Sequence, residues 1–153
     1  MTKKVLNTLI IIGLTVLIMV VVYFKDVIGA VLIHSERIGA EELSAMIRSK
    51  TNPLEGIKKN IDGKEYFIPL PRYTAFYKRK SNLDGLPISY YLTSSQEDAD
   101  WNVYVNEVLP RYGWEKHDQF GAGVIIQRIN SDVKTDFVFQ RFTHFYDMIS
   151  FLD

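Results

Sequence analysis

The most prominent feature of the chain is an uninterrupted apolar segment near its start. From Val5 to Phe24, VLNTLIIIGLTVLIMVVVYF, twenty consecutive residues carry no charge. As a helix with about 1.5 Å of rise per residue, this segment spans roughly 30 Å, close to the hydrocarbon thickness of a bilayer. A helix satisfies its own backbone hydrogen bonds and can therefore cross lipid. The pattern predicts one transmembrane helix, whose expected membrane-anchor residues include Val5, Ile11, Leu17 and Phe24.

A removable signal peptide is the first alternative for this segment. The apolar core of a signal is typically about 7–15 residues long and leads to an Ala-x-Ala-like cleavage site. Here the apolar run is longer, and the nearest pair of small residues is Gly29-Ala30. A buried globular helix is disfavoured as well, because only Gly13 and Thr15 interrupt the apolar surface of the segment's later part. We therefore expect an uncleaved signal anchor.

Basic residues on the two sides of the apolar segment predict its orientation. Lys3, Lys4 and the amino terminus stand before it, whereas Lys25 and Arg37 are the nearest bases after it. The positive-inside tendency then favours a cytoplasmic N-terminus, with the rest of the chain outside the cytoplasm.

The segment after the anchor shows helical spacing and then changes to turns and strands. Over residues 26–38 the apolar positions recur mostly three or four apart, which suggests that the anchor helix continues beyond the bilayer. A second helix is predicted over Glu41–Lys50, since acids open it and bases close it. Residues 51–72 are predicted to form a connector, with a turn around Asp62-Gly63 and an added edge strand over Glu65–Ile68.

Beyond residue 72 the pattern changes to short segments separated by turn residues, which is typical of strands. One longer segment instead carries a broad apolar stripe at helical spacing, formed by Trp101, Tyr104, Val105, Val108, Leu109 and Tyr112. We expect Ser95 to cap the start of this helix. Pro110 and Gly113 should end it at about Val108. The predicted strands are Tyr73–Lys80, Ile88–Thr93, Trp114–Phe120, Val124–Ile129 and Thr135–Phe145, while Asp147–Leu152 is either a strand or a last helical turn.

The order of these elements predicts an α+β fold. Consecutive strands joined by short turns should pair antiparallel, and the helix should cover one face of their sheet. The result is a ββαββ-like architecture, in which a transmembrane helix precedes an antiparallel sheet packed on one main helix. Its expected structural core includes Trp101, Val105, Leu109, Gly113 and Trp114. The expected organisation is a cytoplasmic stub and transmembrane anchor (1–25), a juxtamembrane helical segment and connector (26–72), and an extracytoplasmic α+β domain (73–153).

The main helix and its flanks carry an ordered set of short motifs. YYLTSS precedes the helix, NEVLPRYGW runs across its end, and FGAGVIIQR covers the next turn and strand. This order, over about residues 88–128, resembles a small strand-helix-strand-strand module of bacterial envelope proteins and lipoproteins of unassigned function, in which the helix ends in a Leu-Pro-x-x-Gly-Trp turn. The resemblance implies an α+β domain and a location in the bacterial envelope. It implies no catalytic residue. With the anchor and its orientation, we expect the bacterial inner (cytoplasmic) membrane, with the domain on the periplasmic side.

Composition and charge exclude several classes of partner. The net charge is zero, and because Lys3 and Lys4 precede the apolar run, the chain after it holds two more acids than bases. Nucleic-acid recognition usually needs a clearly basic face, so we expect no nucleic-acid partner. The chain contains no cysteine, which rules out a disulfide or a thiolate metal site.

Residues that could carry chemistry form no familiar motif. His117-Asp118 stands at one predicted strand end. These residues could meet His144 and Asp147 across neighbouring strands and bind a metal, but exposed or capping histidines are the more common explanation. The Gly121-Ala122-Gly123 sequence precedes a strand, so it predicts a hairpin and not a phosphate-binding loop. We expect no catalytic residue, no metal and no cofactor.

Charge is unevenly distributed along the domain. Bases, among them Lys78, Arg79 and Lys80, gather before the main helix, whereas acids gather on the helix and its flanks. We take these three bases as a candidate interaction face, with solvated surface as the alternative. The leading expectation is a non-enzymatic domain that binds a protein partner, in one version an immunity-type inhibitor of an envelope-targeted toxin. The alternatives are an accessory subunit that associates through its transmembrane helix, and a small-ligand-binding or enzymatic domain.

Overall fold

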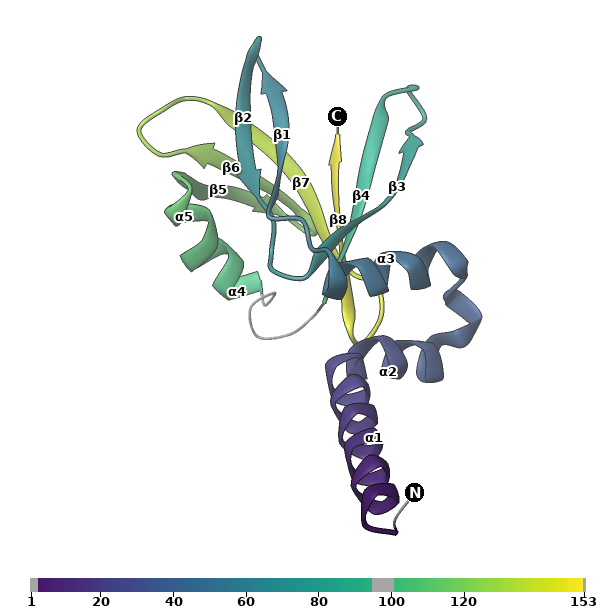
Figure 1. Cartoon of the computed structure of the whole chain (residues 1–153). Helices are drawn as coiled ribbons and strands as arrows, with labels where there is room; N and C mark the ends of the chain where they lie inside the picture. The colour runs from purple at the N-terminus through teal and green to yellow at the C-terminus, as the bar shows by residue number, and fades with distance from the viewer. Residues whose placement is uncertain (1–2, 95–100, 153) are drawn as a thin grey trace.

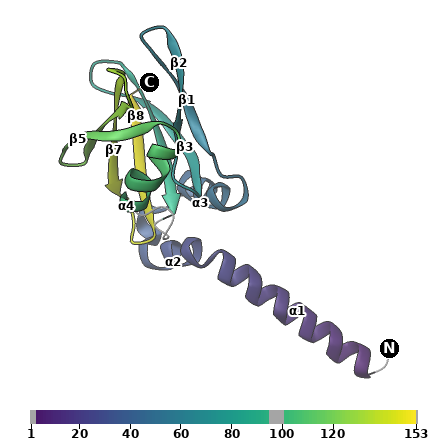
Figure 2. The same cartoon turned by 90° about the vertical axis from the view of Figure 1, so that its left-hand side faces the viewer.

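The computed structural model describes residues 3–94 and 101–152, and it places an isolated apolar helix below an α+β body (Figure 1). The first helix, α1 (Lys3–Tyr23), projects away from everything else in the chain (Figures 1 and 2). Its stretch Val5–Tyr23 has a mean hydropathy of 2.8, and none of it is buried. By length and composition α1 is a candidate membrane span.

The helical path continues after α1, but in a new direction. α2 (Lys25–His34) begins after Phe24, whose φ of −97° and ψ of 14° interrupt the regular helix. The two helices are therefore not collinear (Figures 1 and 2). A short 3₁₀ turn, η1 (Ser35–Arg37), leads on to α3 (Ala40–Thr51). The helix expected over Glu41–Lys50 is thus present, and Glu42 accepts a hydrogen bond from the backbone N–H of Gly39 at its start.

The body is built on a six-stranded antiparallel sheet with the order β3-β4-β8-β7-β6-β5. Strands joined by short turns pair with each other, as expected. The last strand then inserts beside β4, which leaves β3 and β5 as the two edges. The α+β class is confirmed, but the ββαββ-like topology is not matched, because four strands follow the helix. The strands are β3 (Thr74–Ser81), β4 (Pro87–Ser94), β5 (Trp114–Phe120), β6 (Gly123–Arg128), β7 (Lys134–Arg141) and β8 (Tyr146–Leu152).

Two predictions about strands were wrong in detail. The strand expected over Thr135–Phe145 ends at Arg141. The chain turns there because the Thr143 hydroxyl accepts hydrogen bonds from the backbone N–H groups of Phe145 and Tyr146 at 3.2 and 3.1 Å. The segment expected to add an edge strand forms a separate hairpin, β1 (Gly56–Ile61) with β2 (Lys64–Pro69).

The turn between β1 and β2 explains why these strands pair with each other. Asp62 and Gly63 both have positive φ, 53° and 80°. Two such residues in succession form the tight turn whose twist matches an antiparallel pair. The hairpin is held to the body by buried hydrogen bonds: Trp114 donates its indole N–H to the Phe67 carbonyl at 2.9 Å, and Tyr104 donates its hydroxyl to the Pro69 carbonyl at 2.9 Å.

The main helix runs through α4 (Trp101–Val103), a π-helical segment η3 (Tyr104–Val108) and α5 (Leu109–Arg111). The helix continues past the expected end at Val108. In its wider middle turn, the Leu109 N–H donates to the Tyr104 carbonyl, five residues back. Gly113 has a φ of 77°, the left-handed conformation expected of a residue that ends a helix. The cap expected at Ser95 lies outside the described residues.

Two hydrophobic clusters lie on opposite faces of the sheet. The first joins the main helix and the β1–β2 hairpin to one face, and the second joins α2 and α3 to the other. Strand β4 serves both, because Tyr91 points into the first cluster and Leu92 into the second. Among the residues expected in the core, Val105, Leu109 and Trp114 are buried, Trp101 is partly buried against the first cluster, and Gly113 is half-buried.

The second cluster draws its residues from both sides of residue 72. Val27, Ala30, Ala45 and Met46 come from α2 and α3, and they meet Tyr77, Leu92 and Tyr146 from the sheet. Helices α2 and α3 therefore cover one face of the sheet directly.

Candidate functional site

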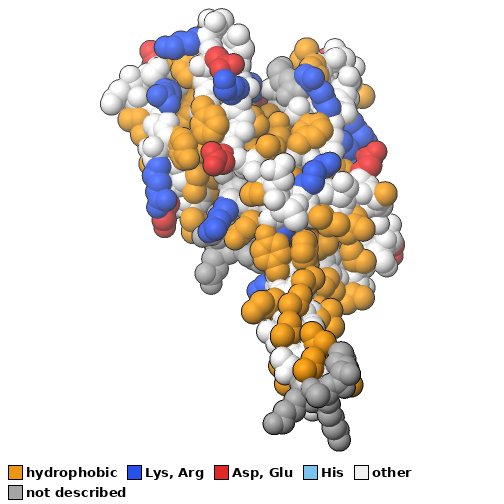
Figure 3. Space-filling view, in the orientation of Figure 1, with side chains coloured by type: hydrophobic (Ala, Val, Ile, Leu, Met, Phe, Trp, Pro, Cys, Tyr) orange, Lys and Arg blue, Asp and Glu red, His pale blue; other side chains and the backbone are white. Residues whose placement is uncertain are grey.

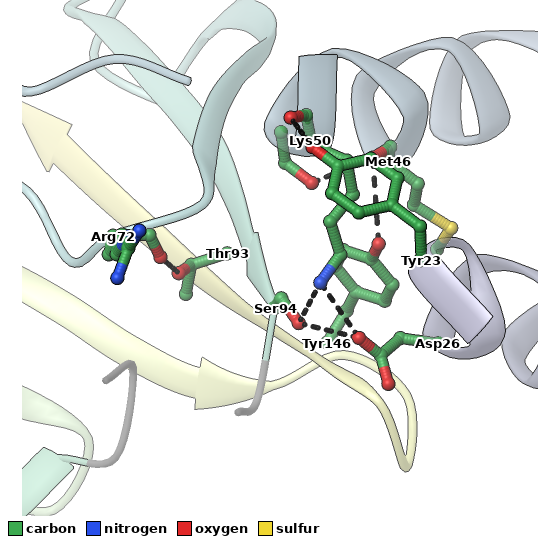
Figure 4. Close-up of polar contacts among 9 residues, drawn as sticks. Tyr23, Asp26, Met46, Lys50, Arg72, Thr93, Ser94 and Tyr146 are labelled. Carbon is green, nitrogen blue, oxygen red and sulfur yellow. Dashed lines mark hydrogen bonds and ion pairs between the residues drawn. The ribbon is translucent and has the colours of Figure 1, made fainter. Parts of the chain in front are cut away.

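The most distinctive polar arrangement lies where α1 meets the body. The ammonium group of Lys50 and the carboxylate of Asp26 form an ion pair at 2.8 Å, although the two side chains are only 3% and 9% exposed. Ser94 completes the group: its hydroxyl accepts from Lys50 at 3.4 Å and donates to Asp26 at 3.2 Å (Figure 4). We call Asp26, Lys50 and Ser94 the junction cluster.

Local structure positions each member of the junction cluster. Asp26 lies in the first turn of α2 and Lys50 in the last turn of α3. A helix stabilises negative charge at its start and positive charge at its end, so both charges stand where their own helix favours them. Ser94 is the last residue of β4. Three separate elements therefore meet at this point.

Aromatic residues connect the junction cluster to α1 and to the sheet. Tyr23, the last residue of α1, donates its hydroxyl to the backbone carbonyl of Lys50 (Figure 4). The Lys50 ammonium also lies 4.5 Å from the centre of the Tyr73 ring, within the range of a cation–π interaction. From the sheet, Tyr146 donates its hydroxyl to the Met46 carbonyl of α3 at 3.5 Å. The end of α1 is thus bonded to the folded body.

The junction cluster fixes how α2, α3 and β4 are placed relative to one another. Removing two charges from water is costly, and the cost is recovered only when each charge meets a close, well-placed partner. Within the described residues, no buried side-chain nitrogen or oxygen lacks a hydrogen-bond partner. The pair therefore favours one relative placement of α2, α3 and β4, because any other placement would separate the charges.

The sequence analysis did not pair Asp26 with Lys50. The burial of Lys50 was nevertheless indicated by its position, because Lys50 falls on the apolar side of its helix with Leu43 and Met46. A charged residue in an apolar stripe is rarely buried without a partner. The identity of that partner depends on how α2 folds back onto the body.

The candidate interaction face Lys78, Arg79 and Lys80 lies on β3, at one edge of the sheet. Lys78 is half-buried and hydrogen-bonded to the Tyr77 hydroxyl at 2.6 Å, whereas Arg79 and Lys80 are exposed. Burial and the hydrogen bond to Glu42 raise the pKa of Tyr77. Although burial opposes it, the hydrogen bond from Tyr77 lowers the pKa of Glu42. Lys78 therefore belongs to a hydrogen-bond network with Tyr77 and Glu42. Of the three bases in the candidate face, Arg79 and Lys80 are the exposed ones.

The histidines considered as metal ligands contact different parts of the fold. His117, on edge strand β5, lies 2.8 Å from the Lys134 ammonium. The backbone N–H of His144, in the β7–β8 turn, donates to the His34 ring at 3.4 Å. Asp147 instead pairs with Arg141 at 2.9 Å. Among the described residues, no group of three or more potential ligands converges on one point.

A hollow of about 540 Å³ lies between the main helix and the segments that flank the β1–β2 hairpin. Leu54, Leu70 and Val108 supply part of its apolar lining. Two of the charged residues that line it, Arg111 and Glu107, pair with each other at 3.3 Å. No nucleophile beside a base lines this hollow in the part of the chain that the structure describes.

Comparison with known proteins finds no family model, no curated protein and no solved structure that matches this chain. The resemblance of residues 88–128 to an envelope module therefore stays a prediction. Fold and site together define a class: an α+β domain joined to a candidate membrane helix through a buried ion pair.

Proposed function

We propose that the chain is a single-pass, membrane-anchored protein whose α+β domain binds another protein outside the cytoplasm. The observation that carries the proposal is the junction cluster. Asp26, Lys50 and Tyr23 bond the end of α1 to the body, so the domain would stand on the membrane in one orientation. A domain held in this way presents the same surface to its surroundings at all times.

The end of the body opposite α1 includes the β3–β4 turn, which offers a contact site (Figure 1). Leu83 is fully exposed and Leu86 is 46% exposed. The turn is ordered, because the Asn82 side chain accepts hydrogen bonds from the backbone N–H groups of Asp84 and Leu86 at 3.0 and 2.8 Å. Exposed leucines on an ordered turn beside a basic strand are typical of a protein contact with an apolar centre and a charged rim. The expected partner surface is apolar and flanked by acids.

Site-specific photo-crosslinking of the full-length protein in living cells tests this proposal. A photoreactive phenylalanine analogue at Leu83 is expected to give a defined protein adduct. The matched control is Phe120, which is 69% exposed at the end of β5. The same adducts at both positions, or none at Leu83, would contradict the proposed contact.

The immunity-type version of this proposal has its own test. Cells that express the chain would resist a toxin directed at the envelope, and Leu83→Asp would abolish the resistance while the protein remains in the membrane. Resistance that survives the substitution would count against this version.

A second candidate function, an accessory subunit of a membrane complex, rests on α1. Nothing lies within 4 Å of the position that a Cβ of Gly13 would occupy, and the Thr15 hydroxyl is bonded to the Ile11 carbonyl of its own helix. This part of α1 could allow a second helix to approach closely. Replacing Val5–Phe24 with an unrelated anchor separates the two functions, because activity is then lost only if α1 makes the contact.

A further inference from the structure

Helix α2 exposes an apolar surface that the body does not cover. Asp26, Val27 and Ala30 are buried against the body. On the remaining surface of α2, Leu32 is 77% exposed, Ile33 is 63% exposed and Ile28 is 38% exposed. A helix on the surface of a soluble domain normally turns polar residues outward. The outer side of α2 is apolar instead.

Helical geometry places Ile28 and Leu32 on one side of α2. At 3.6 residues per turn, residues four apart lie one above the other, so Ile28 and Leu32 form one ridge. Ala30, two residues from each, falls on the opposite side and is fully buried. Gly29, between the two sides, lies against the Phe145 ring. The body therefore occupies one side of α2 and leaves the ridge to another environment.

The position of α2 identifies that environment. α1 ends at Tyr23, and Ile28 follows only about one helical turn after Phe24. The change of direction at Phe24 turns α2 sideways from the end of α1 (Figure 1). In the space-filling view, the apolar surface of α1 continues onto the base of the body (Figure 3). Lys25 and Arg37, both exposed, flank the ridge where lipid headgroups would lie.

We propose that α2 is an interfacial helix, with Ile28 and Leu32 immersed at the boundary between the headgroups and the acyl chains of the bilayer. The proposal rests on the membrane anchoring proposed above. An amphipathic helix lies in this plane with its apolar side about 5–10 Å deep. The ridge of α2 would enter lipid while Asp26, on the buried side, holds Lys50 of the body. The domain would thereby be clamped to the membrane surface.

The absence of cysteine from the chain permits a direct test with single-cysteine variants. Full-length Ile28→Cys, Leu32→Cys, Leu17→Cys and Leu83→Cys proteins are labelled with the fluorophore NBD and reconstituted into nanodiscs of phosphatidylcholine and phosphatidylglycerol. Both leaflets of a nanodisc face the solvent, so the orientation of the protein does not affect access. Quenching is measured with aqueous iodide and with lipids that carry a nitroxide at shallow or deep positions.

Labels at residues 28 and 32 are expected to be quenched by iodide at least about fivefold less than the label at Leu83, and more strongly by shallow than by deep nitroxide. The label at Leu17 should respond most to deep nitroxide. Iodide access at 28 and 32 equal to that at Leu83 would overturn the inference and leave the anchoring intact, provided that Leu17 is protected. Protection from iodide without nitroxide quenching would indicate a protein contact and also overturn it. A label at Leu17 that lipid does not quench would refute the anchoring itself.

Discussion

Lys50 and Asp26 stand 24 residues apart in the sequence and form a 2.8 Å ion pair that is almost completely removed from solvent. Asp26 belongs to the helix that follows α1, and Lys50 belongs to the helix that covers the sheet. The pair therefore holds α2, the helix that follows α1, to the body. Its free energy depends on both charges remaining together.

Asp26→Asn should strongly destabilise the protein, because it leaves the Lys50 ammonium buried without its counter-charge. We expect a loss of about 3–5 kcal/mol in the free energy of unfolding. Denaturant unfolding in detergent micelles, followed by tryptophan fluorescence, measures this loss. A double substitution, Asp26→Leu with Lys50→Met, should recover most of it, because well-packed apolar groups can replace a buried pair.

The matched control for this prediction is the ion pair between Glu107 and Arg111, at 3.3 Å, whose side chains are 57% and 70% exposed. Solvent screens an exposed pair, so Glu107→Gln should cost at most about 0.5 kcal/mol. Equal effects of Asp26→Asn and Glu107→Gln would show that burial of the junction pair has no energetic consequence.

The buried hydroxyl of Tyr146 should make the free energy of unfolding decrease at alkaline pH. Burial raises the pKa of its hydroxyl from 10.0 to about 12. Above pH 10 the unfolded chain releases this proton while the folded chain retains it. The stabilising contribution is therefore complete below pH 10 and disappears as the pH rises toward 12.

Tyr146→Phe removes this group, and the melting temperature should then decline less steeply between about pH 10 and 12 than in the unsubstituted protein. Thermal unfolding followed by circular dichroism at a series of pH values provides the measurement. Tyr112→Phe is the control, since its side chain is 46% exposed, and it should leave the slope unchanged. Identical slopes for all three proteins would contradict the prediction.

The sequence predicted those elements that are specified locally. Alternating residues identified the strands, and helical spacing identified the stripe from Trp101 to Leu109. The glycine at 113 ends its helix as predicted, because a left-handed residue is a property of the local backbone. Some boundaries needed correction, as at the Thr143 turn, where a side chain bonds to the backbone. Strand β1, which pairs with β2 in a separate hairpin, was not predicted.

Elements that depend on distant contacts were not predictable. The pairing of β8 with β4 joins Tyr146 to Ser94, residues separated by the helix and three strands. Nothing near either strand specifies this partner. The junction cluster has the same origin, because Asp26 meets Lys50 only after the chain bends at Phe24. The spacing of Lys50 from Leu43 and Met46 places it on the apolar side of its helix, whereas its partner is determined by the fold.

Gly29 should tolerate no larger residue, because α2 approaches the β7–β8 turn closely there. A Cβ at this position would lie 2.7 Å from the ring of Phe145. Gly29→Ala gains about 1 kcal/mol of helix propensity, but displacing the ring or the helix should reverse that gain, with a net loss of about 1–3 kcal/mol.

The comparison is Gly13→Ala, where a Cβ meets nothing within 4 Å. Thermal unfolding should show Gly13→Ala at least as stable as the unsubstituted protein and Gly29→Ala clearly less stable. A Gly29→Ala protein that matches Gly13→Ala would contradict this close approach.

The β1–β2 hairpin should loosen when Trp114 loses its indole N–H. This side chain is fully buried, and its donor bonds the Phe67 carbonyl at 2.9 Å. Trp114→Phe leaves that carbonyl without its donor and leaves space beside it, which should cost about 1–3 kcal/mol. The effect should concentrate in the hairpin, so the backbone amides of β1 and β2 should exchange with deuterium faster than those of β4 and β8.

Trp101→Phe is the control, because Trp101 is only partly buried and packs on Phe137 and Phe139 of β7. If Trp101→Phe accelerated exchange in the hairpin as much as Trp114→Phe, the Trp114 bond would not be what holds the hairpin to the body.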